Sequence, residues 1–293
     1  MELIRIEDAH ARLEISPGQG AQITRYDAFI AGASVPIFKP GTSEVSHGCQ
    51  LLVPWSNRMS GGGFEFEGRF HPVEPNVPGV PFPSHGDGFQ KRWRVVSTTA
   101  TRAELALDDG SIGPYRYSAR VVYALDNGAL VASLHVENRA AFALPYGLGF
   151  HPWFLRTAGT QLRAPAERVW IVDERNLPTG VEHLASRSDW NFSAQARLPR
   201  GPVNNGFDGW NGKAEIIQQD DGIVISIDAS LELRVYVLYS PSEEDSFFCF
   251  EPVSHPVDAH HGAGLKRLAP GETMQATMRV SWRNMSPHGD QVA

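Results

Sequence analysis

The stretch "YSARVVYALDNGALVASLHVENRA", Tyr117 to Ala140, decides the fold class. Apolar and polar residues alternate on both sides of Asp126-Asn127-Gly128, which is the pattern of two half-buried strands. Asn-Gly readily adopts the positive φ angles of a tight hairpin turn, so the two strands are expected to pair antiparallel. This segment therefore predicts a β-hairpin.

The same period of two recurs along the chain, and no long stretch shows the apolar spacing of a helix. Glycine and proline interrupt the runs at short intervals, as expected of turns between strands. We therefore predict an all-β protein, with two large antiparallel sheets packed face to face in a single domain over residues 1–284, and a disordered tail over residues 285–293. The further strand-like runs are "LIRIEDAHARLEIS" (3–16), "AQITRYDAF" (21–29), "GIVISIDASLELRVYVLYS" (222–240) and "TMQATMRVSW" (273–282).

Composition excludes several classes of function. The net charge of −7 argues against nucleic-acid binding, which needs a basic face. No run approaches the roughly 18 apolar residues of a membrane span, and "MELIRIEDAH" lacks the pattern of a signal peptide. The only cysteines, Cys49 and Cys249, lie among apolar residues, so we expect two buried free thiols in a cytoplasmic protein.

Two polar clusters lie in or before a glycine- and proline-rich region, residues 61–89, that is expected to be mostly loop around a short hairpin. Asn57 and Arg58 follow the strand-like "LLVPW". The arginine either lies on the surface as a solvated charge or lines a pocket, where its guanidinium binds hydroxyls or a carboxylate. His85 lies in the glycine-rich turn "PSHGDGF" as a solvated loop residue or a site residue. Long structured loops of β proteins are common places for binding sites.

Two further clusters each place one ionisable residue among aromatic side chains. His151 lies in "GLGFHPWF", next to Trp153, and Glu251 ends the aromatic run "SFFCF". Each is either a buried group held by a hydrogen bond or ion pair, or one half of an acid–base pair. Aromatic rings can stack on the C–H faces of sugars, and burial can adjust both pKa values for proton transfer. The pattern favours acid–base chemistry on a polyhydroxylated substrate.

The segment "SHPVDAHH" after Glu251 invites a metal interpretation. Its His255, Asp258, His260 and His261 have the spacing of neither a zincin helix nor a Cys/His zinc site, and the segment contains a proline. The sequence also lacks the glycine-rich nucleotide motifs and the G-x-S-x-G elbow of serine hydrolases. We therefore expect neither a metal nor a cofactor.

The ordered motifs "SNR", "HG", "GFHPWF", "FDGWNGKAEI", "FEPVSHPVDAHH" and "GLKRLAPGETMQATMRVSW" resemble the aldose 1-epimerase family, also called galactose mutarotases. The resemblance covers nearly the whole chain, from about residue 10 to residue 284. It implies an antiparallel β-supersandwich that interconverts the α and β anomers of free aldoses. It also implies that Glu251 is the general base on the anomeric hydroxyl, that His151 protonates the ring oxygen, and that Arg58 and His85 bind the sugar.

One position departs from the family pattern. The chain reads "NNGFDGW", so Asn204 stands where relatives often have an aspartate. Asp208, four residues later, restores a carboxylate only if the loop is rearranged. Both are retained as candidate sugar-binding residues, together with Asn57 and Trp153.

Three other functions stay open on the sequence. The first is an isomerase or mutarotase of an anionic sugar derivative, phosphorylated, uronic or sulfonated, and the second is a non-catalytic carbohydrate-binding protein. The third is a glycosidase, which needs a second carboxylate beside Glu251, and Asp208 is its candidate. The expected partner is a small-molecule sugar, with no nucleic acid or membrane, and the protein is expected to be a monomer or homodimer.

Overall fold

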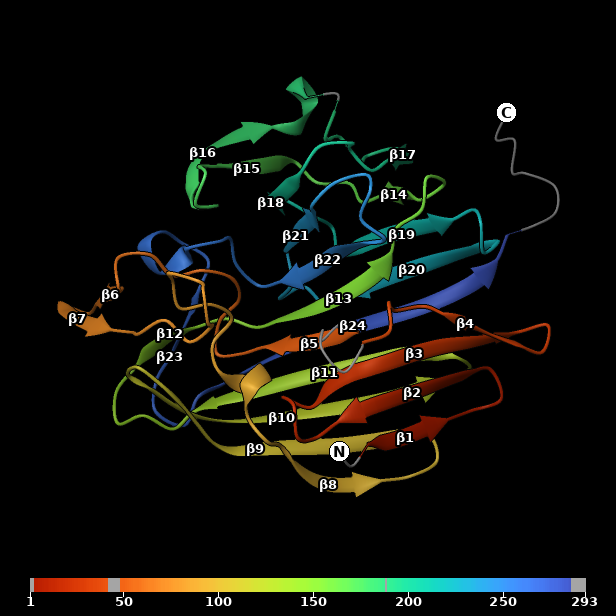
Figure 1. The fold of residues 1–293 in the computed structure, drawn as a ribbon. Coiled ribbons are helices and arrows are strands. Elements are labelled where there is room, and N and C mark those ends of the chain that lie inside the picture. Colours follow the sequence, from red (N-terminus) through yellow and green to blue (C-terminus); the bar gives the residue numbers. More distant parts are fainter. Residues whose placement is uncertain (1–2, 42–47, 188, 286–293) are drawn as a thin grey trace.

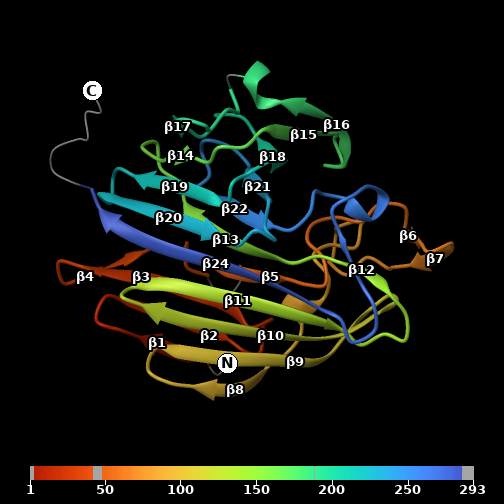
Figure 2. The ribbon, with the colours of Figure 1, turned by 180° about the vertical axis from the view of Figure 1, so that it is seen from behind.

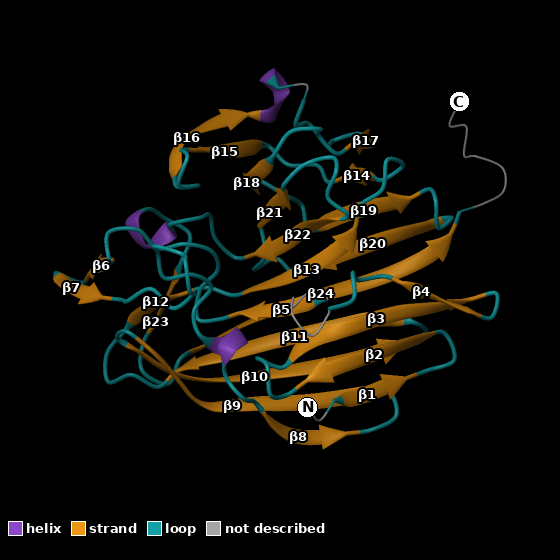
Figure 3. Cartoon of the chain, viewed as in Figure 1, coloured by secondary structure: helices purple, strands orange, loops and turns teal. Residues whose placement is uncertain are grey.

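The computed structural model describes residues 3–41, 48–187 and 189–285, so all of the predicted tail after Met285 lies outside the described residues. Strands dominate these ranges, which contain no α-helix and no helix long and apolar enough to span a membrane (Figure 3). The prediction of an all-β protein is confirmed. The helical turns are the short 3-10 helices η1 (Gly88–Gln90), η2 (Leu184–Ser186) and η3 (Ala259–His261).

The larger sheet has eleven strands that pair antiparallel (Figure 1). In spatial order its strands are β1 (Ile4–Glu7), β2 (Ala11–Ser16), β3 (Gln22–Ile30), β5 (Cys49–Leu52), β13 (Gly149–Leu155), β22 (Phe247–Val253), β21 (Val235–Ser240), β18 (Val203–Asp208), β15 (Arg168–Val172) and β16 (Pro178–His183), with β4 (Ala33–Pro36) paired to β3.

The second sheet has nine antiparallel strands and forms the other layer, seen from behind in Figure 2. In spatial order its strands are β17 (Ala196–Arg197), β14 (Gln161–Arg163), β19 (Lys213–Gln218), β20 (Ile223–Ala229), β24 (Thr273–Asn284), β11 (Ala129–Asn138), β10 (Tyr115–Asp126), β9 (Arg102–Ile112) and β8 (Arg94–Thr98). Two small two-stranded sheets pair β12 (Leu144–Tyr146) with β23 (Lys266–Leu268) and β6 (Gly63–Phe66) with β7 (Arg69–Pro72).

The predicted hairpin forms at the predicted turn. Asp126 pairs with Ala129 at the end of β10 and β11, and Asn127 and Gly128 have φ angles of 49° and 82°. Two consecutive positive φ angles are what the type I′ two-residue hairpin loop requires, which is why Asn-Gly suits it. The short hairpin expected within residues 61–89 is also present, as β6 and β7.

The main hydrophobic core lies between the two large sheets. Buried tyrosines hydrogen-bond across it: the Tyr26 hydroxyl of β3 donates to the carbonyl of Gly128, at 2.7 Å, and the Tyr123 hydroxyl of β10 donates to the carbonyl of Ala21, at 2.8 Å. These bonds satisfy polar groups that would otherwise be costly to bury.

Strand alternation then determines what the larger sheet presents on its outer face. In β13, Phe150 and Phe154 point into the core, so His151 between them points to the opposite face. In β22, Phe248 and Phe250 belong to the core, so Glu251 also points outward. The fold therefore presents both ionisable groups on the same outer face.

Candidate active site

His151 and Glu251 are neighbours across two paired strands. The pairs Gly149–Val253 and Trp153–Cys249 define the register of β13 and β22, and this register places His151 opposite Glu251. Their Nε2 and Oε1 atoms lie 3.3 Å apart. The two candidate proton-transfer groups therefore lie side by side on one strand pair.

The segment that follows β5 brings Asn57, Arg58 and His85 to the same place. The backbone N–H of Asn57 donates to Nδ1 of His85, at 2.9 Å. The side-chain oxygen of Asn57 accepts hydrogen bonds from the backbone N–H of Arg58, at 2.9 Å, and from its Nη1, at 3.1 Å. Asn57 therefore orients both the histidine and the guanidinium.

The hydrogen bond to His85 determines its tautomer. Burial, together with the nearby His151 and Arg58, lowers the pKa of His85 well below its ordinary value, so the ring is neutral. Because Nδ1 accepts a hydrogen bond from Asn57, the ring proton is on Nε2. His85 can therefore act as a neutral hydrogen-bond donor.

These side chains share one pocket of about 460 Å³, which has room for a monosaccharide. Asn204 of β18 and Tyr239 of β21 are paired residues that line it from the neighbouring strands. Glu251 is the one carboxylate residue among the described residues that line the pocket. The lining residues are Asn57, Arg58, His85, His151, Asn176, Pro202, Val203, Asn204, Tyr239, Pro241 and Glu251.

Burial shifts the two central pKa values in opposite directions. It raises the pKa of Glu251 to about 8, an effect that the charge of Arg58 partly opposes, and it lowers the pKa of His151 to about 4. Both shifts favour the uncharged forms of the pair, a protonated Glu251 carboxyl beside a neutral His151 ring. The contact between Nε2 and Oε1 gives the carboxyl proton a direct route to His151.

The structure does not bring Asp208 to this pocket. Asp208 lies at the opposite end of β18 from Asn204, roughly 13 Å along the strand. Its Oδ1 accepts hydrogen bonds from Arg168, at 2.7 and 3.0 Å, and its Oδ2 accepts one from Trp170 Nε1, at 3.2 Å. It lines a separate hollow of about 720 Å³. This placement corrects the prediction of a sugar contact, and it removes Asp208 as the second carboxylate of a glycosidase.

Trp153 is also absent from the described lining of the pocket. Its indole stacks on the imidazole of His151, with ring centroids 5.4 Å apart and planes at 17°. Trp153 therefore packs against the histidine rather than offering its face to a sugar. It restricts the orientations that the His151 ring can adopt.

The "SHPVDAHH" segment anchors the loop that carries Arg58. The ring Nε2 of His255 accepts a hydrogen bond from the backbone N–H of Ser56, at 3.1 Å. The carboxylate of Asp258 accepts bonds from the backbone N–H and the hydroxyl of Ser60, at 2.8 and 2.7 Å. These contacts give His255 and Asp258 a positioning role on the two sides of Asn57 and Arg58.

Sequence reasoning missed Asn176 and Tyr239. Asn176 comes from the loop between β15 and β16, where it has a φ of 60°. Its loop is held by Asp173, whose Oδ1 accepts hydrogen bonds from the backbone N–H groups of Arg175 and Leu177, at 2.9 Å each. The sequence "DERN" indicates such a turn, but nothing in it shows that the turn reaches a pocket 25 residues away in the chain from His151.

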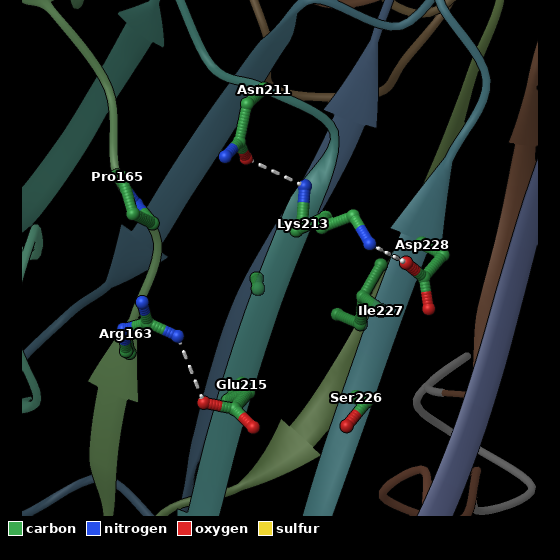
Figure 4. A pocket seen from close by; sticks show the side chains of 9 residues that line it. Arg163, Pro165, Asn211, Lys213, Glu215, Ser226, Ile227 and Asp228 are labelled. Carbon is green, nitrogen blue, oxygen red and sulfur yellow. Dashed lines mark hydrogen bonds and ion pairs between the residues drawn. The ribbon is translucent and has the colours of Figure 1, made fainter.

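A hollow over β14, β19 and β20 of the other sheet has a different character (Figure 4). Its Arg163 pairs with Glu215, at 3.3 Å, and its Lys213 pairs with Asp228, at 3.5 Å. Exposed pairs of this kind balance each other's charge and are worth little energetically. The buried His151–Glu251 pair, by contrast, has two strongly shifted pKa values in one pocket, which is typical of a functional site.

Comparison with known proteins identifies the family of this chain. A family model described as aldose 1-epimerase matches residues 2–281. The uncharacterized protein YphB of Escherichia coli K12 is 35% identical over 264 residues, which cover 85% of this chain and 90% of YphB. The uncharacterized protein YihR of the same organism is 28% identical over 244 residues, which cover 80% of this chain and 79% of YihR.

Solved structures show the same architecture. The crystal structure of an Escherichia coli K12 protein, provisionally named an aldose 1-epimerase, has a TM-score of 0.90 at 31% identity, and the match covers 97% of this chain and 99% of that chain. A galactose mutarotase-like protein from Clostridium acetobutylicum has a TM-score of 0.83 at 18% identity, over 97% of this chain and 95% of the other, which shows the shared fold alone. The single-domain fold is therefore galactose mutarotase-like, and this chain belongs to the aldose 1-epimerase family.

Proposed function

We propose that this protein is an aldose 1-epimerase that interconverts the anomers of a free sugar. The observation that carries the proposal is the buried pair of His151 and Glu251, in contact at 3.3 Å on the floor of a pocket that Arg58 also lines. Opening a cyclic hemiacetal needs one group to take a proton from O1 and another to give a proton to the ring oxygen. Both oxygens are bonded to C1, so an acid and a base side by side suit this reaction.

In the proposed ring opening, Glu251 as carboxylate takes the O1 proton while protonated His151 gives its proton to the ring oxygen. The C1–O5 bond breaks, the aldehyde forms, and rotation about C1–C2 presents its other face. Closure then returns both protons. The pair holds the same number of protons throughout, so the two residues work in both directions without any net exchange with solvent.

The preferred proton position in the sugar-free protein bears on this cycle. With the pKa of Glu251 near 8 and that of His151 near 4, the shared proton rests on Glu251, which is the arrangement that ring opening produces. Binding of the cyclic sugar must therefore favour transfer of that proton to His151. Arg58 assists, because its positive charge favours the carboxylate form of Glu251.

Polarimetry or NMR of freshly dissolved α-glucose and α-galactose tests the proposal. We expect the purified protein to accelerate mutarotation and Glu251→Gln to lower the rate by about 10²–10⁴, the usual contribution of a proton-transfer group. Glu215→Gln makes the same chemical change on the other sheet, where the carboxylate is partly exposed, and should leave the rate unchanged. Sugar binding without acceleration of any aldose would instead identify a carbohydrate-binding protein.

An anionic sugar derivative is the second candidate substrate. It is favoured by Arg58, whose guanidinium lines the pocket, and by Asn204, which places a neutral amide where relatives often have a carboxylate. Replacing a carboxylate by an amide removes charge repulsion with an anionic ligand. Including a uronic and a phosphorylated aldose in the same assay tests this candidate, since higher kcat/KM for these than for neutral sugars is its expected result.

We also propose a cytoplasmic location. Cys49 and Cys249 are free and buried, as predicted, and free thiols are usual in a reducing compartment. Fractionation of cells that produce the protein checks this location.

A further inference from the structure

A soft ligand lies next to the acid–base pair. Cys249 is two residues before Glu251 in β22, so its side chain points to the same outer face of the sheet. One ligand atom each of His151, Cys249 and Glu251 lie within 4.8 Å of one another, and all three residues are buried. The second cysteine, Cys49, belongs instead to the core between the sheets.

Two polar atoms of this cluster have unused binding capacity. Among the described residues, neither Oε2 of Glu251 nor Nδ1 of His151 has a hydrogen-bond partner, although both atoms are buried. Glu251 is only 3% exposed and His151 only 8%. Buried polar atoms without partners are uncommon, and leaving them unpaired costs free energy. An ion that binds to these side chains can offset part of that cost.

The donor set has the chemistry of a zinc site. A thiolate, an imidazole and a carboxylate are the ligands that zinc and similar thiophilic divalent ions take from proteins, usually in tetrahedral geometry. With metal–ligand bonds of about 2.0–2.3 Å, neighbouring ligand atoms lie roughly 3.3–3.8 Å apart, so side-chain shifts of about 1 Å would close the observed cluster. His151 and Glu251 line the pocket, so an ion can reach these two ligands through it.

We propose that a zinc-class divalent cation binds His151, Cys249 and Glu251 and thereby inhibits the protein. Binding forms bonds to one atom of each side chain, and the Cys249 thiol and the Glu251 carboxyl each release a proton to solvent as their bonds to the metal form. The inhibition rests on the proposed function, because the ion then occupies both proton-transfer groups. The binding itself does not depend on that function.

Cadmium binding provides a readout apart from activity. The protein is first dialysed against EDTA and freed of the chelator, then titrated with Cd²⁺, and the thiolate-to-cadmium charge-transfer absorption in the ultraviolet is recorded. We expect the band to reach its maximum at one equivalent per chain. Cys249→Ala should abolish the band, and Cys49→Ala, which removes the other buried thiol, should keep it. If Cys249→Ala does not fold, Cys249→Ser replaces it, with the same expectation for the sulfur band.

Inhibition gives the second readout. We expect micromolar-range Cd²⁺ or Zn²⁺ to stop mutarotation reversibly, with EDTA restoring the rate, and loss of the sulfur ligand to raise the half-inhibitory concentration by at least about tenfold. Cys249 is absent from the described pocket lining, so Cys249→Ala should retain the metal-free rate. Three results would overturn the proposal: a band that survives in Cys249→Ala, no band in the wild-type protein, or a rate that requires zinc. If no aldose is accelerated, the absorption titration still decides whether the ion binds.

Discussion

The shared proton of His151 and Glu251 predicts the pH dependence of turnover. The proposed reaction uses the pair with one proton, and this form exists between the pKa of His151, about 4, and that of Glu251, about 8. Below the lower value both groups are protonated, so the base is lost. Above the upper value both are deprotonated, so the acid is lost. We therefore expect a bell-shaped profile of kcat/KM.

The size of the effect follows from the same two values. At pH 7 about nine-tenths of the protein has the singly protonated pair, whereas at pH 9 about one-tenth has it. The value of kcat/KM should therefore fall roughly tenfold between these two pH values, and its logarithmic plot should approach a slope of minus one only above about pH 9. The assay is polarimetry with a neutral aldose, corrected for the uncatalysed reaction in each buffer.

Arg58 gives the profile a second test. Its charge favours the ionised form of Glu251, so removing it in Arg58→Met should raise the pKa of Glu251 and move the alkaline limb upward by about one pH unit. Arg58→Lys is the matched control, because it weakens bidentate sugar contacts but keeps the charge, and its alkaline limb should stay near that of the wild type. An alkaline limb that stays in place or moves downward in Arg58→Met would refute this account of the electrostatics.

Four further outcomes are expected. Glu251→Gln should gain in Tm relative to the wild type as pH rises from about 4.5 towards 8. Over this range the carboxyl of Glu251 ionises in the unfolded chain but stays protonated in the folded protein, so the wild type loses stability that the variant keeps. His151→Asn should lose about 10²–10⁴ of the mutarotation rate at pH 7 while sugar binding, measured by calorimetry, stays within about tenfold. Asn204→Asp should lower kcat/KM for an acidic aldose at least about tenfold more than for glucose, and equal effects on both substrates would contradict the charge argument. Asp208→Asn should leave KM for neutral sugars unchanged but lower Tm, because it weakens the contacts to Arg168; a several-fold rise in KM would show that Asp208 does reach the sugar.

Local patterns in the sequence were enough to predict the fold class. The alternation from Tyr117 to Ala140 and the Asn127-Gly128 turn depend only on residues close in the chain, and the structure has the corresponding strands and positive φ angles. In the structure the same alternation puts Phe150 and Phe154 on the core side of β13 and His151 on the other side. Nearby residues determine these features because side-chain direction in a strand has a period of two.

The sequence also identified residues that line the pocket, but not their arrangement. His151 and Glu251 are one hundred residues apart, and only the register of β13 and β22 makes them neighbours. That register depends on how the whole sheet packs on its core. The opposite pKa shifts follow from burial, which is likewise a property of the assembled fold.

The choice between Asn204 and Asp208 shows most clearly what the sequence determines and what only the tertiary structure decides. The two residues are four positions apart in β18, so their side chains lie on the same face of the sheet. Alternation therefore cannot distinguish them. The structure places Asn204 beside Tyr239 in the pocket and Asp208 beside Arg168 in another hollow. Chain periodicity determines which face of a sheet a residue occupies, whereas its position along that face, and therefore its chemical partners, is decided by the strands and loops that tertiary packing brings alongside it.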